Sequence, residues 1–245
     1  GTQKAALALA QELGFSCPVI EIADIASHAV STIESVANRQ LSWESDDLTL
    51  QNVQARARSL VIWTLANANN AMLLTTGNMS EAAVGYATMD GDSSGCLDPI
   101  GNIPKTLVSR WLEWARQFHK IDALDFVFAQ PPSAELRPAH QNQADETDLM
   151  PYPVLDALIE WFLVRRMTPK EILQCAKNQL ANYYTNADDI EKDVKRFIQL
   201  TVRSQWKRAR FANEFIILPF NIAPDDGLRW PCLQAPFRRA IDEMA

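Results

Sequence analysis

The sequence predicts an α/β protein with a doubly wound parallel sheet and a helical C-terminal extension. Within residues 1–136, segments with helical periodicity alternate with single short apolar runs. Such alternation implies parallel strands joined by helical crossovers. From residue 153 onward the periodic patterns are helical only. The 245 residues are 47% hydrophobic and 22% charged, which is ordinary for a globular protein and argues against disorder or a coiled coil.

Four helices are expected in the first part of the chain. Alanine and leucine dominate the first one, and Gly14 follows where a helix C-cap belongs. Pro104 opens the last one, because proline is pre-organised for the first helical position. The predicted helices cover residues 2–13, 23–37, 48–68 and 104–119.

Three short apolar runs are predicted as strands: CPVIEI (17–22), AMLLTT (71–76) and DFVF (125–128). Ligands of open α/β sheets bind beyond the carboxyl ends of the strands. The loops after residues 76 and 128 are therefore the expected location of a functional site.

The C-terminal part is expected to consist of helices over residues 153–165, 169–181 and 187–210, with an irregular tail over 214–245. Thr168 and Glu171 have the spacing of a capping box before the second of these helices. Residues 137–152, which connect the two parts, are polar and lack a period. We expect them to form a mobile loop.

Charge and cysteine content exclude several classes of function. The net charge of −7 disfavours a nucleic-acid surface, because phosphate contacts need clustered Lys and Arg. No apolar run of about 18 residues is present, so no membrane span is expected. The four cysteines are far apart, which favours a reduced, cytoplasmic setting over a disulfide framework or a zinc knuckle. No HExxH or GxSxG motif occurs.

Glycine is scarce and concentrated. Five of the eight glycines lie within residues 77–101, and no Gly-Gly pair occurs. The segment TTGNMSEAAVGYATMDGDSSGCLDPIGNIPK (75–105) is rich in groups that can bind phosphate, and Glu81 and Asp92 could hold a metal ion such as Mg²⁺. Local capping is the alternative, because Asn78 and Glu81 have capping-box spacing.

Two sets of cations suggest anion binding. Lys105 lies in the first turn of a predicted helix, where the macrodipole disfavours a cation unless an anion binds there. An exposed lysine is the alternative. In RSQWKRAR (203–210), Arg203, Lys207 and Arg210 would share one helix face, as an anion site or as a solvated stripe.

These segments resemble the NAD synthetases, which belong to the ATP-pyrophosphatase group. The resemblance covers TTGNMSEAAVGYATMDGDSSG with PIGNIPK, and extends to QNVQARAR upstream and to PPSAELRP, QADETDLMPY and WKRAR downstream. The SAELRP and KRAR forms are more similar to the glutamine-dependent long synthetases. The resemblance implies an adenine-nucleotide α-hydrolase-like fold. Residues 1–136 would be part of a nucleotide-binding synthetase domain, residues 137–152 its lid and residues 153–245 its helical extension.

The resemblance also implies a reaction. ATP adenylates the nicotinate carboxylate of deamido-NAD with release of pyrophosphate, and ammonia, free or derived from glutamine, then gives NAD and AMP. ATP and Mg²⁺ would be required, and the protein would be a homodimer. By position in the motifs, Glu81 would hold Mg²⁺ and act in catalysis with Lys105; ATP would contact Thr76, Lys105 and Ser133; and deamido-NAD would contact Arg56, Asp92 and Lys207.

One family motif is absent. The pyrophosphate loop Ser-Gly-Gly-x-Asp-Ser does not occur, and we expect it to precede residue 1, so that these 245 residues alone are inactive. The alternative is a degenerate, non-catalytic nucleotide-binding or dimerisation module of the same fold. A third candidate is another ATP pyrophosphatase such as a GMP synthetase, against which YATMDGD and KRAR argue.

Overall fold

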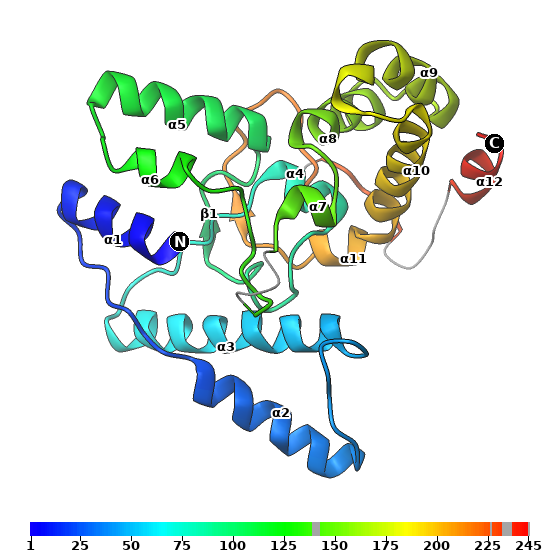
Figure 1. Ribbon diagram of the computed structural model, residues 1–245. Coiled ribbons are helices and arrows are strands. Elements are labelled where there is room, and N and C mark those ends of the chain that lie inside the picture. The colour runs from blue at the N-terminus through cyan, green and yellow to red at the C-terminus, as the bar shows by residue number, and fades with distance from the viewer. Residues whose placement is uncertain (139–142, 226, 232–236, 245) are drawn as a thin grey trace. The chain divides into compact units, whose positions relative to one another are not determined.

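The computed structural model describes residues 1–138, 143–225, 227–231 and 237–244 (Figure 1). The chain divides into two compact units. Unit 1 comprises Gly1–Val61 and Leu107–Leu149, and unit 2 comprises Ile62–Thr106 and Met150–Ala245.

The described part of unit 1 is helical. It contains α1 (Thr2–Leu13), α2 (Ala23–Ala37), most of α3 (Asp47–Ala68) and of α5 (Lys105–His119), α6 (Leu124–Phe128) and α7 (Asp145–Asp148). The four helices expected in this part of the chain are confirmed. Gly14 ends α1 in the left-handed conformation with φ 74°, which a residue without a Cβ atom adopts at no steric cost.

Two of the predicted strands in unit 1 are wrong. Residues 17–22 form no strand, and residues 125–128 belong to helix α6. The carboxylate of Glu12 accepts the backbone N–H groups of Asp122 (2.9 Å) and Ala123 (2.6 Å), next to the start of α6. Helices α1 and α6 lie side by side (Figure 1). A side chain of α1 thus satisfies donors that a helix start leaves unpaired.

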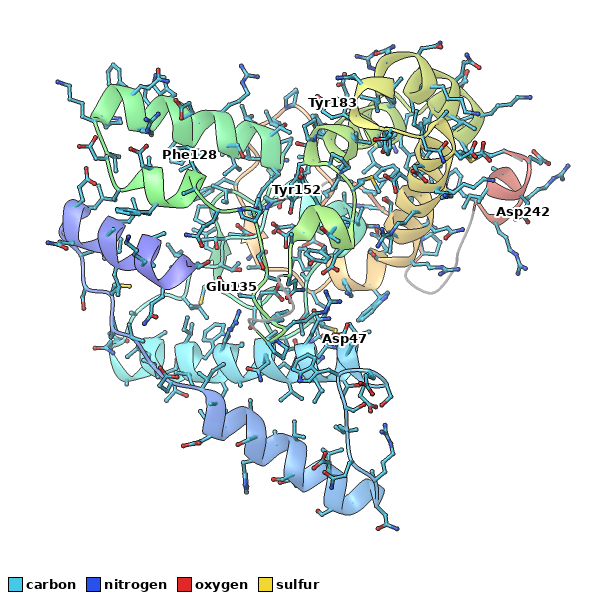
Figure 2. All side chains as sticks on the ribbon, viewed as in Figure 1. Asp47, Phe128, Glu135, Tyr152, Tyr183 and Asp242 are labelled. Atoms are coloured by element: carbon cyan, nitrogen blue, oxygen red, sulfur yellow. The ribbon has the colours of Figure 1, made fainter. Side chains whose placement is uncertain are left out.

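Arg137 joins the predicted loop to helix α3. Its guanidinium pairs with Asp47 (Nε to Oδ1, 2.9 Å), at the start of α3, and with Asp148 (Nη1 to Oδ1, 2.9 Å), at the end of α7; Asp47 is labelled in Figure 2. The short helix α7 lies within residues 137–152, which were expected to form an aperiodic loop. Residues 139–142 lie outside the described residues, and the lid stays a prediction.

Unit 2 contains short elements around a group of longer helices. They are α4 (Met79–Val84), β1 (Leu97–Asp98), α8 (Tyr152–Ile159), the π-helix η2 (Glu160–Val164), α9 (Pro169–Gln179), the 3₁₀ turn η3 (Ala181–Tyr183), α10 (Ala187–Arg203), α11 (Gln205–Arg208), β2 (Asn213–Glu214) and α12 (Arg238–Asp242).

The sheet is smaller than expected. In the described residues, β1 and β2 pair in parallel, with Leu97 opposite Asn213 and Asp98 opposite Glu214. The predicted strand 71–76 contributes one bridge, between Leu74 and Leu97, and Leu74 is 52% exposed rather than buried. The parallel pairing agrees with the expected class, but a doubly wound order is not formed by these residues.

The core of unit 2 lies between α8, α9 and α10, where α9 and α10 pack against each other (Figure 1). The rings of Phe162 and Phe197 meet edge to face with centroids 5.9 Å apart. The largest fully buried apolar side chains here include Phe197, Met79, Leu155, Leu158, Ile172 and Ile198. None of the helices in the described ranges has the length and apolar character needed to cross a membrane.

The helix expected over residues 187–210 is interrupted at Ser204. The Ser204 hydroxyl donates to the carbonyl oxygens of Leu200 (2.6 Å) and Val84 (2.9 Å). Helix α10 ends before this residue and α11 begins after it. The bond to Val84 is a tertiary contact, which helical periodicity does not reveal.

The capping box at the start of α9 is confirmed and gives a prediction for stability. Thr168 Oγ1 accepts the N–H of Glu171 (3.4 Å), and Glu171 Oε2 accepts the N–H of Thr168 (2.7 Å). We expect Thr168→Ala to lower the free energy of unfolding by about 1 kcal/mol, because the N–H of Glu171 loses its acceptor. Urea denaturation measures the change. Thr168→Ser, which keeps the hydroxyl, is the control, and equal stability of all three proteins would contradict the prediction.

Candidate functional site

Glu81 and Lys105 form an ion pair in unit 2. Glu81 lies on α4, whose start is capped by Asn78: the Asn78 side chain accepts the N–H of Glu81 at 3.0 Å. Lys105 is the first residue of α5, and its Nζ lies 3.2 Å from Glu81 Oε1. The two side chains are 22% and 21% exposed. The cap predicted at Asn78 is confirmed, and metal binding by Glu81 stays a prediction.

Lys105 is not an exposed lysine. Its Nζ lies 5.2 Å from the centroid of the Tyr152 ring, at the start of α8 (Figure 2). Within the same unit, Asp156 of α8 accepts the N–H of Thr106 at 2.9 Å. Protein carboxylates, on Glu81 and Asp156, thus supply the negative charge that a helix start favours.

The other end of α4 is closed by glycine and by Lys207. Gly85 has φ 66°, and a Cβ atom there would lie 2.3 Å from Ser204 Oγ, so this position requires glycine. Lys207 Nζ donates to the carbonyl oxygens of Gly85 (2.7 Å) and Ala87 (2.9 Å). Burial lowers the pKa of Lys207, and the charge of Asp92 opposes this shift.

Arg208 is a buried cation that the sequence did not single out. It is 3% exposed and donates to the carbonyl oxygens of Ala83 (2.7 Å) and Thr201 (2.7 Å). Cations close to the last carbonyls of a helix compensate its dipole. The sequence WKRAR indicated a cluster of cations, but only the fold shows which of them is buried.

The predicted common face of Arg203, Lys207 and Arg210 is wrong, because the helix breaks at Ser204. Arg203 is exposed, and Arg210 Nη2 donates to Asp90 Oδ1 at 2.8 Å. Of the three, only Lys207 lies against α4.

Asp92 and Thr76 lie in the glycine-rich segment of unit 2. Both are exposed. The Asp92 carboxylate accepts the N–H of Thr88 at 2.6 Å, and its carbonyl oxygen accepts the hydroxyl of Thr75 at 2.7 Å. Asp92 acts electrostatically on Lys207. The structure thus brings together Glu81 with Lys105, and Asp92 with Lys207.

Arg56 and Ser133 belong to unit 1. Arg56 is exposed on α3, and Ser133 is half-buried, with its hydroxyl accepting the N–H of Glu135 at 3.1 Å. Arg58, two residues after Arg56, donates to the carbonyl oxygens of Ala134 (3.0 Å) and Glu135. In this unit Arg58 therefore contacts the segment around Ser133; Glu135 is labelled in Figure 2.

Two carboxyl groups that no sequence pattern indicates, the buried Asp98 and the half-buried Glu214, also lie in unit 2. Asp98 and Glu214 face each other across the β1–β2 pair. Burial raises the pKa of Asp98 to about 7, and the charge of Glu81 adds to this shift. Burial, followed by the charge of Asp98, raises the pKa of Glu214 to about 7. Because 116 residues separate them, neither spacing nor periodicity could have indicated the pair.

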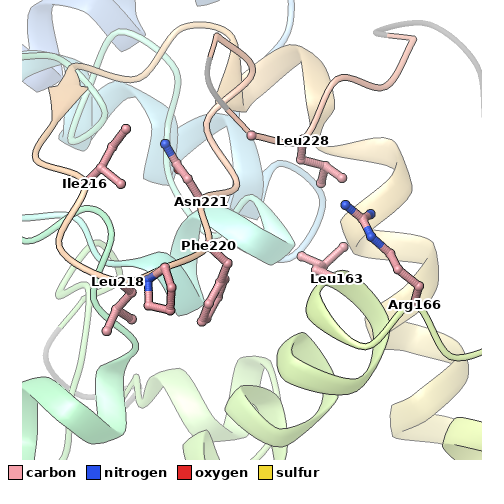
Figure 3. Close-up of a pocket in the computed structure, with 9 residues that line it drawn as sticks. Leu163, Arg166, Ile216, Leu218, Phe220, Asn221 and Leu228 are labelled. Atoms are coloured by element: carbon pink, nitrogen blue, oxygen red, sulfur yellow. The ribbon is translucent and has the colours of Figure 1, made fainter.

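The described part of unit 2 contains cavities. One has a volume of about 370 Å³ and is lined by residues that include Leu163, Arg166 and Phe220 (Figure 3). Another, of about 270 Å³, is lined by residues that include Arg208 and Glu214. Neither is lined by any of the residues predicted to act in catalysis or to bind ATP, deamido-NAD or Mg²⁺.

The parallel β1–β2 pair among helices is consistent with an α/β protein, and within unit 2 Glu81 pairs with Lys105 and Lys207 binds the end of α4. A family profile described as NAD synthase matches residues 2–209. The chain belongs to the NAD synthase family.

Relatives support this membership. A glutamine-dependent NAD(+) synthetase of Rhodobacter capsulatus is 32% identical over 212 residues, which are 83% of this chain and 35% of that protein. One from Synechocystis is 33% identical over 230 residues, 94% of this chain and 37% of that protein. The crystal structure of the glutamine-dependent NAD(+) synthetase from Cytophaga hutchinsonii superposes with a TM-score of 0.84 and 33% identity, covering 99% of this chain and 38% of that one. The chain thus spans about a third of the length of these relatives.

The buried carboxyl pair gives a prediction for stability against pH. The pKa of Asp98 is about 7 in the folded protein, compared with an ordinary value of 3.8. Between these two pH values the folded state therefore binds more protons than the unfolded state. Stability contributed by the protonated group is present at low pH and is lost as the pH rises through 7. When the pH is raised from about 5.5 to about 8.5, the free energy of unfolding of Asp98→Asn should fall by about 2 kcal/mol less than that of the unchanged protein.

Denaturation at several pH values measures this difference. Asp242→Asn, at an exposed position (Figure 2), is the control and should follow the unchanged protein. The same pH dependence in all three proteins would show that Asp98 does not titrate in this interval.

Proposed function

We propose that the chain is the synthetase region of a glutamine-dependent NAD synthetase, which amidates deamido-NAD to NAD at the expense of ATP. The observation that carries the proposal is the Glu81–Lys105 pair, which lies in the segment that resembles the family and within the residues matched by the family profile. The ammonia would be supplied by glutamine hydrolysis or taken up directly.

The proposed chemistry has two steps. An oxygen of the nicotinate carboxylate attacks the α-phosphorus of ATP, and the bond to pyrophosphate breaks. Ammonia then attacks the acyl carbon, loses a proton and displaces AMP, which leaves the carboxamide of NAD. Negative charge moves onto the leaving pyrophosphate in the first step, so fixed cations accelerate it.

Lys105 would supply such a cation. With nucleotide bound, its ammonium group would turn from Glu81 to the phosphates of ATP, to which it would bind together with Thr76 and Ser133. Arg56, Asp92 and Lys207 would bind deamido-NAD. These assignments follow the motif positions, and for Lys105 and Lys207 they agree with the half-buried cations seen in unit 2.

The residues at this place fit a magnesium ion. Mg²⁺ uses one or two protein carboxylates together with substrate phosphates. Glu81 would hold it, since its carboxylate is 21% exposed and is bound in this structure by the ammonium group of Lys105, which a metal ion would replace. Bound with ATP, the ion would neutralise charge on the leaving pyrophosphate.

Further properties of the proposal concern the whole protein. A doubly wound sheet, a lid over residues 137–152, a homodimer and a cytoplasmic location are proposed on the resemblance to the family. A lid would keep water away from the adenylate, which is readily hydrolysed.

Glu81→Gln tests the proposed function. In the protein at its full natural length, NAD formation from deamido-NAD, ATP and ammonia should fall by about 100-fold or more, because the variant loses the metal-binding charge. The product is quantified by an enzymatic cycling assay for NAD.

Glu160→Gln serves as the control, since Glu160 is an exposed glutamate whose partner is Arg165. Its rate should equal that of the unchanged protein. Full activity of Glu81→Gln would end the metal-binding role. An unchanged protein that exchanges pyrophosphate with ATP in the presence of xanthylate, and not of deamido-NAD, would overturn the proposed reaction.

A further inference from the structure

Asp156 links three helices around the Glu81–Lys105 pair. Its Oδ1 accepts the hydroxyl of Ser80, from α4. Its Oδ2 accepts the hydroxyl of Thr106 (2.6 Å) and the N–H of Thr106 (2.9 Å), from the first turn of α5. Ser80 is fully buried and itself accepts the N–H of Lys105 at 2.8 Å. One carboxylate of α8 thus binds the starts of both other helices.

The start of α5 needs such partners from elsewhere in the chain. The residue before it, Pro104, has no side-chain oxygen to cap the helix. The first N–H groups of a helix lack intrahelical acceptors and carry a partial positive charge. Here Ser80 satisfies the N–H of Lys105, and Asp156 that of Thr106. The carboxylate therefore holds this backbone by both hydrogen bonding and charge.

The residues held are neighbours of the two groups assigned to chemistry. Ser80 precedes Glu81 in α4, and Thr106 follows Lys105 in α5. A carboxylate that fixes Ser80 and Thr106 in common also fixes the separation of the Glu81 and Lys105 backbones. Helix α8 adds Tyr152, whose ring lies 5.2 Å from Lys105 Nζ.

We propose that Asp156 is a positioning residue, which sets the place of Lys105 relative to Glu81 and thereby directs the lysine to the reacting phosphates. This inference rests on the proposed function, because it assigns the two residues to ATP and its metal. Asp156 itself touches no reacting atom in this proposal; it acts through Ser80 and Thr106.

The substitution Asp156→Asn separates positioning from folding. Asparagine keeps the size of the side chain and one oxygen acceptor, but its amide group replaces the second oxygen with a donor. The hydrogen bonds to Ser80 and to Thr106 cannot then both be kept as they are. Asp156→Ala would remove the acceptors altogether and risks unfolding unit 2, so the asparagine variant is the informative one.

The test measures NAD formation in the protein at its full natural length. We expect Asp156→Asn to lower kcat by about 10- to 100-fold, because a misplaced cation loses stabilisation of the transition state. KM for deamido-NAD should change by less than about threefold, since Asp156 is not assigned to that substrate. Unchanged kcat in an otherwise active protein would overturn the proposal.

A second arm uses Lys105→Met. If Asp156 acts through Lys105, Asp156→Asn should cause no further loss of kcat in the Lys105→Met background. A merely structural role would give the same fold-loss in both backgrounds. Additive losses would therefore also overturn the proposal.

Asp193→Asn is the matched control. Asp193 is another partly buried aspartate of unit 2; burial raises its pKa, as it raises that of Asp156, and it accepts the hydroxyl of Tyr184 at 2.8 Å. Its substitution should leave kcat unchanged.

Amide hydrogen exchange provides a readout without activity. Peptides covering residues 79–84 and 104–108 should exchange faster in Asp156→Asn than in the unchanged protein and in Asp193→Asn. If the unchanged protein forms no NAD, the proposed function is overturned. Amide hydrogen exchange would still decide whether Asp156 holds the two helix starts. Equal exchange in all three proteins would overturn the positioning role itself.

Discussion

The start of helix α5 is the constraint on which the site depends. Its first backbone donors have no acceptor nearby in the sequence, and buried donors without acceptors are costly. Ser80 and Asp156 satisfy them from two other helices. The same hydrogen bonds join α4 and α8 to the first two residues of α5, so that the Glu81–Lys105 pair is held by groups that are required for the helix start itself.

Helix α4 has charged groups at both of its ends. Glu81 lies in its first turn, and at its last carbonyls lie Lys207, bound to Gly85, and Arg208, bound to Ala83. Negative charge at the start and positive charge at the end both compensate the dipole. This short helix therefore carries a carboxylate at its start and is met at its end by two cations that its carbonyl oxygens and Gly85 bind.

The site was predictable where the signal is local. The Asn78 cap and the position of Lys105 at a helix start follow from neighbouring residues, whereas the Glu81–Lys105 ion pair joins residues 24 positions apart and was not predicted. The sequence showed the glycine cluster but not why Gly85 is needed. Glycine is required there by a φ of 66° and by the close approach of Ser204, which is 119 positions further on. Asp98 and Glu214 could not be found, since a raised pKa arises from burial and from a partner that only the fold supplies.

The sequence by itself determined the helices with local start and stop signals, such as Gly14 after α1, Pro104 before α5 and the Thr168–Glu171 capping box, because their hydrogen bonds close within a few residues. Tertiary structure decided the rest. Apolar runs 17–22 and 125–128 looked like strands, but a strand exists only with a partner. The second run instead lies in helix α6, and Glu12 accepts backbone N–H groups just before the start of that helix. Ser204 ends α10 through a bond to Val84, and Asp156 reaches α5 from α8. These outcomes depend on contacts between residues far apart in the chain, and no local pattern encodes them.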